Sequence, residues 1–145
     1  MRGSFVASAL WLGARLPPAA LFCLAGSGHF REPQKFIGIM EGMWWPQLHP
    51  AAVYLTGIAE LALSLALALA PSARVARWLI YLVLAMSPAN LNMWRGDVPF
   101  GEARLTYGWT GTHALRGVLQ ILLLLWLRRL EVCMRDAPQM KALSA

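Results

Sequence analysis

The stretch VYLTGIAELALSLALAL, residues 53–69, contains a single charged residue, Glu60. A carboxylate is costly to bury in hydrocarbon unless it is paired or neutralised. A second apolar run, which ends at Leu127, has Arg116 near its start. An acid and a base inside the apolar runs of one small chain predict a buried polar site.

The composition of the 145-residue chain indicates lipid as its solvent. The chain is 58% hydrophobic and only 14% charged, whereas a soluble domain usually carries about 25% charged residues. A membrane-spanning helix needs roughly 20 apolar residues to cross ~30 Å of hydrocarbon. Four such stretches and short loops use nearly the whole sequence. We therefore predict one all-α domain, a four-transmembrane-helix bundle.

The predicted membrane helices cover residues 15–30, 51–70, 74–94 and 110–130. Pro17 and Pro18 suit the first turn of a helix, and Pro88 is expected to kink the third helix. A short interfacial helix is predicted around Pro33 to Met43, between the first two spans. Residues 131–145 are predicted to form a polar, mobile tail.

Basic residues predict the orientation of the bundle. With four spans, one side holds Arg2, Arg15, Arg74, Arg77, Arg128, Arg129, Arg135 and Lys141, and the other holds Arg31, Lys35, Arg95 and Arg104. Because positive residues concentrate on the cytoplasmic side of membrane proteins, we predict both termini in the cytoplasm. Residues 4–14 are interpreted either as an interfacial lead-in or as the apolar core of a signal peptide.

Charge and cysteine content exclude other classes. The net charge of +6 comes from basic residues scattered at the predicted helix ends, where they meet lipid head groups, so we expect no nucleic-acid binding. Cys23 and Cys133 are far apart, and a dithiol relay needs neighbouring thiols. Because the sequence has no metal-ligand spacing, we predict no metal site.

Two predicted helices place polar side chains on one face. The spacing i, i+4, i+8 relates Thr56, Glu60 and Ser64 on one helix and Thr112, Arg116 and Gln120 on the other. At ~1.5 Å per residue, Glu60 and Gln120 lie at a similar depth and Arg116 one turn nearer the outer surface. A Glu60–Arg116 ion pair, with Gln120 as a neighbouring donor, is geometrically allowed. Asn90 would approach from the third helix.

His29, at the outer end of the first predicted helix, has two interpretations. It is either a plain interfacial residue, as we interpret His113, or it caps the Glu60/Arg116 site and could pass a proton to a bound quinone or another ligand. We define the polar cluster as His29, Thr56, Glu60, Asn90, Arg116 and Gln120. The cluster is either a ligand or proton site or a polar clasp that fixes helix register.

Five short stretches follow one another in a specific order: Ala25–Phe30 with Pro33 and Phe36, Leu55–Glu60 with Pro71, Arg74–Trp78, Ser87–Asn90 with Met93, and Arg116–Gln120. In this order and spacing the chain resembles the DoxX family of small four-helix membrane proteins, over roughly residues 15–128. One departure is Gly117-Val118, which stands where the family often has leucine–proline.

The resemblance implies an integral protein of a bacterial inner (plasma) membrane. Some members of that family are subunits of a thiosulfate:quinone oxidoreductase, others are linked to membrane redox complexes, and distant relatives are assembly factors. We therefore expect a redox-associated subunit that binds a quinone, works with a partner subunit and is not an enzyme on its own. The first alternative is a non-enzymatic assembly or interaction factor whose cluster is a helix clasp. A transporter is the second, and it would need a homo-oligomer.

Overall fold

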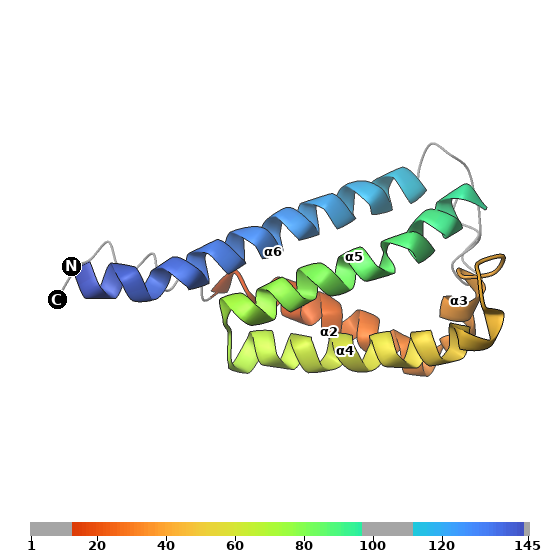
Figure 1. Ribbon diagram of the computed structural model, residues 1–145, viewed down its shortest axis with the longest axis horizontal. Coiled ribbons are helices and arrows are strands. Elements are labelled where there is room, and N and C mark those ends of the chain that lie inside the picture. The colour runs from red at the N-terminus through yellow and green to blue at the C-terminus, as the bar shows by residue number, and fades with distance from the viewer. Residues whose placement is uncertain (1–12, 97–111, 144–145) are drawn as a thin grey trace.

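The computed structural model describes residues 13–96 and 112–143 and is all-helical over that range. Its elements are α2 (Leu16–Arg31), α3 (Pro33–Gly38), the 3-10 helix η1 (Pro46–Leu48), α4 (His49–Leu69), α5 (Ala73–Arg95) and α6 (Thr112–Leu143). The four long helices lie along one axis as an elongated bundle (Figure 1). The predicted all-α class is confirmed, and the expectations for residues 4–12 and for residues 97–111 lie outside the described range.

Local signals in the sequence account for most helix ends. Pro17 and Pro18 occupy the first turn of α2, where a missing N–H costs nothing. Ser72 caps α5, because its hydroxyl oxygen accepts a hydrogen bond from the Val75 amide at 3.2 Å. α5 continues through Pro88. The short helix after α2 ends at Gly38, earlier than the predicted Met43.

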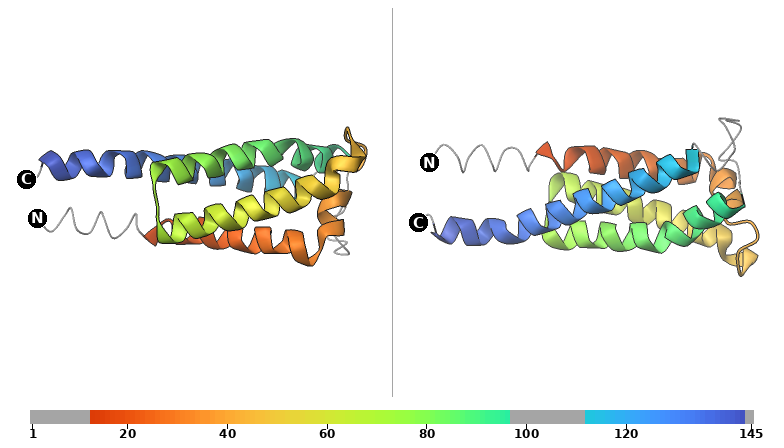
Figure 2. Two further views of the ribbon diagram at one scale, coloured as in Figure 1. Left: turned by 60° about the horizontal axis from the view of Figure 1, so that its bottom comes forward. Right: turned by 90° about the horizontal axis from the view of Figure 1, so that it is seen from above.

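The predicted end of the fourth helix at Leu130 is wrong, because α6 continues to Leu143. The extra turns project beyond the other helices (Figure 2). Glu131 lies three residues after Arg128 and four before Arg135, and it forms ion pairs with both. Pairs at these spacings stabilise a helix, so the segment interpreted as a polar tail is a continuation of the helix.

The helices form two pairs that are joined at one end of the bundle. α2 packs along α4 and α5 packs along α6, while the contact between the pairs is chiefly α4 against α5. The apolar core lies at the end with the α4–α5 turn, and its members are Ala19, Phe22, Leu67, Ala76, Leu79, Val83, Leu127, Leu130 and Met134. The opposite end, near α3 and η1, lies outside this apolar core, so a polar site can be placed there.

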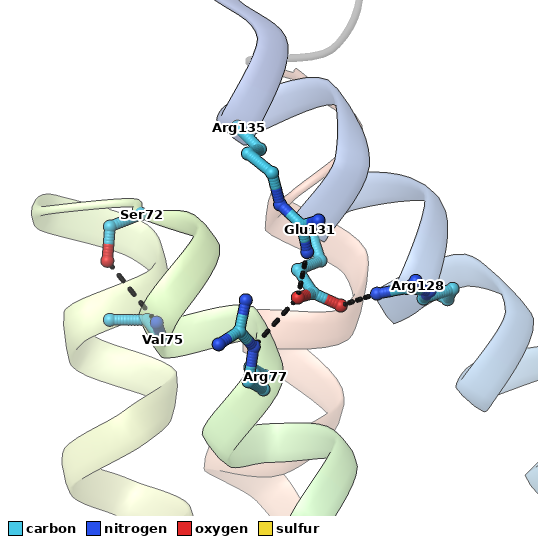
Figure 3. Close-up of polar contacts among 6 residues, drawn as sticks. All are labelled: Ser72, Val75, Arg77, Arg128, Glu131 and Arg135. Carbon is cyan, nitrogen blue, oxygen red and sulfur yellow. Dashed lines mark hydrogen bonds and ion pairs between the residues drawn. The ribbon is translucent and has the colours of Figure 1, made fainter.

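Glu131 fastens α6 to α5 beside this core (Figure 3). Its side chain is 2% exposed. It accepts hydrogen bonds from Arg77 Nε at 2.8 Å, from Arg135 Nη2 at 2.7 Å and from Arg128 Nη1. Burial alone would raise the pKa of Glu131, but the hydrogen bonds from the three arginines outweigh it and lower the pKa to about 2. The carboxylate is therefore ionised at neutral pH.

The outward faces of the long helices are apolar. The described part of α6 alone exposes eight large apolar side chains, Leu115, Val118, Leu119, Ile121, Leu122, Leu125, Trp126 and Val132. Among the described residues, one helical segment, Pro46–Leu69, with a mean hydropathy of 1.9, is long and apolar enough to cross a membrane. Only 28% of its apolar window is buried, which is unlike the core helix of a soluble protein. The four predicted spans stay a prediction.

Replacing Glu131 by Gln is expected to lower stability at pH 7. The change removes the charge that three arginines bind, and a hydrogen bond to a charged group contributes about 1.5–3 kcal/mol. The folded-state pKa lies below the ordinary 4.5, so the stabilisation is complete above pH 4.5 and is lost as the pH falls toward 2. Thermal unfolding followed by circular dichroism should show a gap between wild type and Glu131→Gln that closes over this range.

Asp136→Asn is the matched control for this prediction. Asp136 lies on the same helix, and it is exposed. Its neutralisation should change the unfolding midpoint little, because an exposed charge contributes only ~0–1 kcal/mol. Equal midpoints for wild type and Glu131→Gln at pH 7 would contradict the role assigned to the three arginines.

Candidate functional site

Two glycines let α2 and α4 approach closely at the centre of the site. A Cβ atom on Gly57 of α4 would lie 2.7 Å from His29 Cβ, and one on Gly26 of α2 would lie 3.0 Å from Glu60 Cβ. Real Cβ atoms essentially never come as near as 2.7 Å, so Gly57 is required for the observed helix separation. Each glycine therefore makes room for a titratable residue of the opposite helix.

His29 and Glu60 meet at this crossing. His29 Nε2 lies 3.3 Å from Glu60 Oε2, and the two side chains are only 7% and 4% exposed. The contact has the distance of an ion pair but lacks the alignment of a hydrogen bond, since Oε2 has no hydrogen-bond partner among the described residues. The carboxylate of Glu60 is thus buried beside one imidazole with its hydrogen-bonding capacity unused.

The backbone of α4 fixes the state of the His29 ring. His29 Nδ1 lies 2.8 Å from the Val53 carbonyl oxygen, and a carbonyl oxygen only accepts, so Nδ1 carries the hydrogen. In a neutral imidazole, Nε2 would then be a bare acceptor facing a carboxylate. Two bare acceptors repel each other, so a hydrogen-bond donor placed between them would relieve the contact. The pair therefore presents unused acceptor capacity.

Two neighbours hold the imidazole in place. The Phe36 ring stacks on His29, with centroids 3.9 Å apart and an interplanar angle of 26°, so α3 covers the pair. Thr56 donates its hydroxyl hydrogen to the Ala52 carbonyl at 2.8 Å. Its oxygen lies 3.4 Å from His29 Nδ1 and can accept from it. These contacts orient the ring toward Glu60.

A second polar chain connects α5 to α6. Ser87 donates to the Val83 carbonyl at 2.9 Å, so its oxygen is left to accept from Gln120 Nε2 at 2.7 Å. Gln120 Oε1 in turn accepts from Asn90 Nδ2 at 3.0 Å. One backbone carbonyl therefore sets the direction of the whole chain, and its acceptor end is Asn90 Oδ1, which accepts no hydrogen bond from a described residue.

The two pairs of helices enclose a partly open cavity of about 680 Å³. This volume falls within the usual range of small-molecule sites, roughly 300–1,000 Å³. Apolar side chains such as Leu24, Met40 and Met86 form much of its wall. A second hollow of about 410 Å³ lies at the opposite end beside Trp126; its lining is almost wholly apolar, and it contains none of the polar cluster.

The cavity brings most of the predicted cluster together. Its lining includes His29, Thr56, Glu60, Asn90 and Arg116, and Gln120 lies behind Asn90 as its hydrogen-bond partner. The ion pair of Glu60 is with His29, whereas the sequence allowed one with Arg116. Arg116 instead lines the same cavity from α6. The side chain of Thr112 lies outside the described part of the chain.

Sequence reasoning missed several residues of this region. In the sequence, Phe36 was noted only beside the stretch Ala25–Phe30. An aromatic side chain shortly after the end of a helix can fold back onto that helix, as Phe36 does onto His29. Asn92 Nδ2 donates to the carbonyls of Ile39 and Glu41, both at 2.9 Å, and ties the loop after α3 to α5. His113, interpreted as interfacial, is buried at 8% exposure. No local signal distinguishes these positions, because their partners are distant in the sequence.

A comparison with protein families gives one match. A family model described as Domain of unknown function (DUF8561) matches residues 19–131. This range runs from the first turn of α2 to Glu131 and includes every residue that lines the cavity. No curated protein and no solved structure matches the chain.

Replacing Gly57 by Ala is expected to destabilise the α2–α4 crossing. The added methyl group would meet His29 Cβ, which is rigidly attached to the backbone, and overpacking of this kind costs about 1–3 kcal/mol. That cost exceeds the ~1 kcal/mol that Ala gains over Gly in a helix. Gly38→Ala is the matched control, because a Cβ atom there meets nothing within 4 Å. A midpoint of thermal unfolding lower than that of Gly38→Ala is the expected result, and equal midpoints would refute it.

Proposed function

Because the chain belongs to the family described as Domain of unknown function (DUF8561), we propose its function from the site itself. We propose an integral membrane protein of four spans that binds a small ligand of the quinone class beside His29 and Glu60. In this proposal it acts as a redox-associated subunit, as the resemblance to the DoxX family suggests. The observation that carries it is the buried Glu60 carboxylate, with no hydrogen-bond partner among the described residues, on the wall of a ligand-sized cavity.

The distribution of polarity supports the membrane assignment. Titratable side chains such as His29, Glu60 and His113 are buried, whereas leucines and aromatic rings cover the outside. In water this arrangement would expose far more contiguous apolar surface than monomeric proteins normally carry. In a bilayer it is favourable, because lipid covers the apolar faces and the polar groups find partners inside the bundle.

The helix lengths support the membrane assignment as well. α4 and α5 contain 21 and 23 residues, or about 32 and 35 Å at ~1.5 Å per residue, close to a ~30 Å hydrocarbon core. The described part of α2 is shorter, at 16 residues. α6, at 32 residues, reaches past the bilayer and carries its arginine-bound Glu131 into the head-group region.

Charge at the two ends supports cytoplasmic termini. The end with the α4–α5 turn carries Arg15, Arg74, Arg77, Arg128, Arg129 and Arg135. The opposite end carries fewer basic residues and the exposed Trp44 and Trp45, which suit a head-group belt. By the positive-inside tendency, the arginine-rich end faces the cytoplasm.

A quinone-class ligand fits the chemistry of this cavity. Its flat ring suits a wall of methionine and alanine side chains with Phe36 beside it. Its oxygens would meet His29, Glu60 and Asn90, which converge from three helices. A bound quinone supplies two-electron, two-proton redox chemistry, and the chain's own contribution is to bind the ring and hold a proton at the His29–Glu60 pair. The redox centre that exchanges electrons with the ligand belongs, in this proposal, to a partner subunit.

The alternative is a non-enzymatic assembly or interaction factor. One observation favours it: the His29–Glu60 pair joins α2 to α4, and the Asn90–Gln120 hydrogen bond joins α5 to α6. Both contacts would fix helix register in a bundle without a ligand. The two functions differ in what filling the cavity should do.

The native cysteines test the membrane topology. Cys133 lies on α6 beyond Arg129, and Cys23 lies within α2, both exposed on the outer surface of the bundle. A membrane-impermeant maleimide should label Cys133 in inside-out vesicles and leave it unlabelled in right-side-out vesicles. Cys23 should react in neither, because lipid covers it. Single variants Cys23→Ser and Cys133→Ser assign the label, and labelling of Cys23 in intact vesicles would contradict the span proposed for α2.

Filling the cavity tests ligand binding. Ala52 lines the cavity, whereas Ala62 of the same helix is exposed and does not. Ala52→Trp should weaken the binding of 1,4-naphthoquinone at least about tenfold, because loss of ~1.4 kcal/mol already produces that change. Ala62→Trp should leave the affinity unchanged. Both variants also carry Cys23→Ser and Cys133→Ser, because a quinone adds to exposed thiols. Isothermal titration of the detergent-purified protein, with unfolding midpoints as a check on folding, measures both variants.

Absence of binding to a well-folded wild-type protein would reject the ligand function and leave the helix clasp. Native mass spectrometry of the same preparations adds a second measurement. It reports any small molecule that co-purifies with the wild type and with Ala62→Trp but not with Ala52→Trp, and it gives the oligomeric state at the same time.

A further inference from the structure

Two polar side chains that line the cavity, Glu60 and Asn90, have hydrogen-bond acceptors without a donor among the described residues. Acceptors of this kind distinguish between the two redox forms of a ligand, because only the reduced form carries O–H donors. Each polar chain in the site begins at a backbone carbonyl oxygen, which can only accept. The Val53 carbonyl binds His29 Nδ1–H, and the Val83 carbonyl binds the Ser87 hydroxyl. Donor groups near the backbone are therefore used within the protein, and acceptors are left at the ends that face the cavity.

The first such end is the carboxylate of Glu60. It accepts no hydrogen bond from a described residue, and its Oε2 atom has only the ion-pair contact with His29 at 3.3 Å. The second end is Asn90 Oδ1. The order Ser87, Gln120, Asn90 forces the Asn90 amide group to present Nδ2 to Gln120, so Oδ1 lies on its other branch. Both Glu60 and Asn90 line the cavity.

The charges on the cavity wall favour a neutral ligand. The lining contains two arginines, Arg31 and Arg116, and two acidic residues, Glu32 and Glu60. The two positive and the two negative side chains balance, so these groups leave little net charge for a ligand to neutralise. An anionic ligand such as a fatty acid would meet the unpartnered Glu60 carboxylate and be repelled.

We infer that the site prefers the reduced, hydroxyl-bearing hydroquinone to the oxidised quinone, an inference that rests on the proposed quinone-class function. A hydroquinone donates one O–H group toward the Glu60 carboxylate and another toward Asn90 Oδ1. A quinone carries only carbonyl oxygens and leaves both acceptors without a donor, and the Glu60 Oε2 atom is buried. A buried acceptor left unpaired costs about 1–3 kcal/mol, so the hydroquinone should bind at least about tenfold more tightly.

The test measures anaerobic binding of three naphthalene compounds to the full-length protein in detergent. Cys23→Ser and Cys133→Ser are introduced first, because quinones add to thiols. The compounds are 1,4-naphthoquinone, 1,4-dihydroxynaphthalene and 1,4-dimethoxynaphthalene, and the last keeps the reduced ring but has no O–H group. The dihydroxy compound should bind at least about tenfold more tightly than either of the others. This order would separate hydrogen-bond donation from ring shape.

A matched substitution assigns the preference to the carboxylate. Glu60→Gln keeps the size of the side chain and adds an N–H donor, so the ratio of hydroquinone to quinone affinity should fall severalfold toward one. Glu131→Gln, at the other end of the bundle, should leave the ratio unchanged. If Glu60→Gln does not fold, the comparison with the dimethoxy compound on the otherwise unchanged chain decides the question.

The possible failures are distinguishable. Binding of none of the three compounds would overturn the proposed function, and this inference with it. Equal binding of the quinone and the hydroquinone would overturn the inference alone and leave the ligand function standing. Tighter binding of the quinone would overturn it too, and would assign the recognition to a donor such as the Arg116 guanidinium.

Discussion

The close crossing of α2 and α4 at Gly26 and Gly57 is the constraint on which the site depends. Without side chains at these two positions, the helix backbones can approach until His29 and Glu60 lie against each other. Close approach also buries the pair, whose side chains are only 7% and 4% exposed. The stacked Phe36 ring then covers the imidazole. A single steric fact thus determines the geometry of the pair.

The two ends of the bundle have different roles, one in stability and one in the candidate site. The end with the α4–α5 turn holds the apolar core and the Glu131 cluster, which fasten α5 to α6. At the opposite end the cavity lies between the two helix pairs, and Asn92 of α5 donates to the loop after α3. A ligand site needs unused volume and unused hydrogen-bonding groups, both of which cost stability. Tight packing at the first end offsets that cost.

The two polar chains of the site follow the same rule. In each chain, a backbone carbonyl oxygen accepts a hydrogen bond from the first side chain. The acceptor atom that has no donor among the described residues then lies at the other end of the chain, at the cavity. Backbone carbonyls cannot change role, so the direction of each chain is a property of the fold and not of the side chains alone. This is why His29 has a defined tautomer and Asn90 a defined orientation.

The sequence by itself determined the helices and named the residues of the site. Proline, serine and glycine act on the backbone within a few residues, so the ends of α2, α4 and α5 were predicted to within about two residues, and the i, i+4 spacing of Thr56 and Glu60 identified a polar face. The end of α6 was missed, because residues 131–145 were interpreted as a polar, mobile tail and the ion pairs of Glu131 with Arg128 and Arg135 were not recognised.

Only the tertiary structure decided which polar groups meet. Glu60 pairs with His29 and not with Arg116, because pairing depends on how far each helix is rotated about its axis, and that rotation is set by the contacts of Gly26 and Gly57. Likewise, Arg77 reaches Glu131 across 54 positions of sequence. Local patterns specify the face on which a side chain lies, but a contact between two faces depends on the packing of the whole bundle.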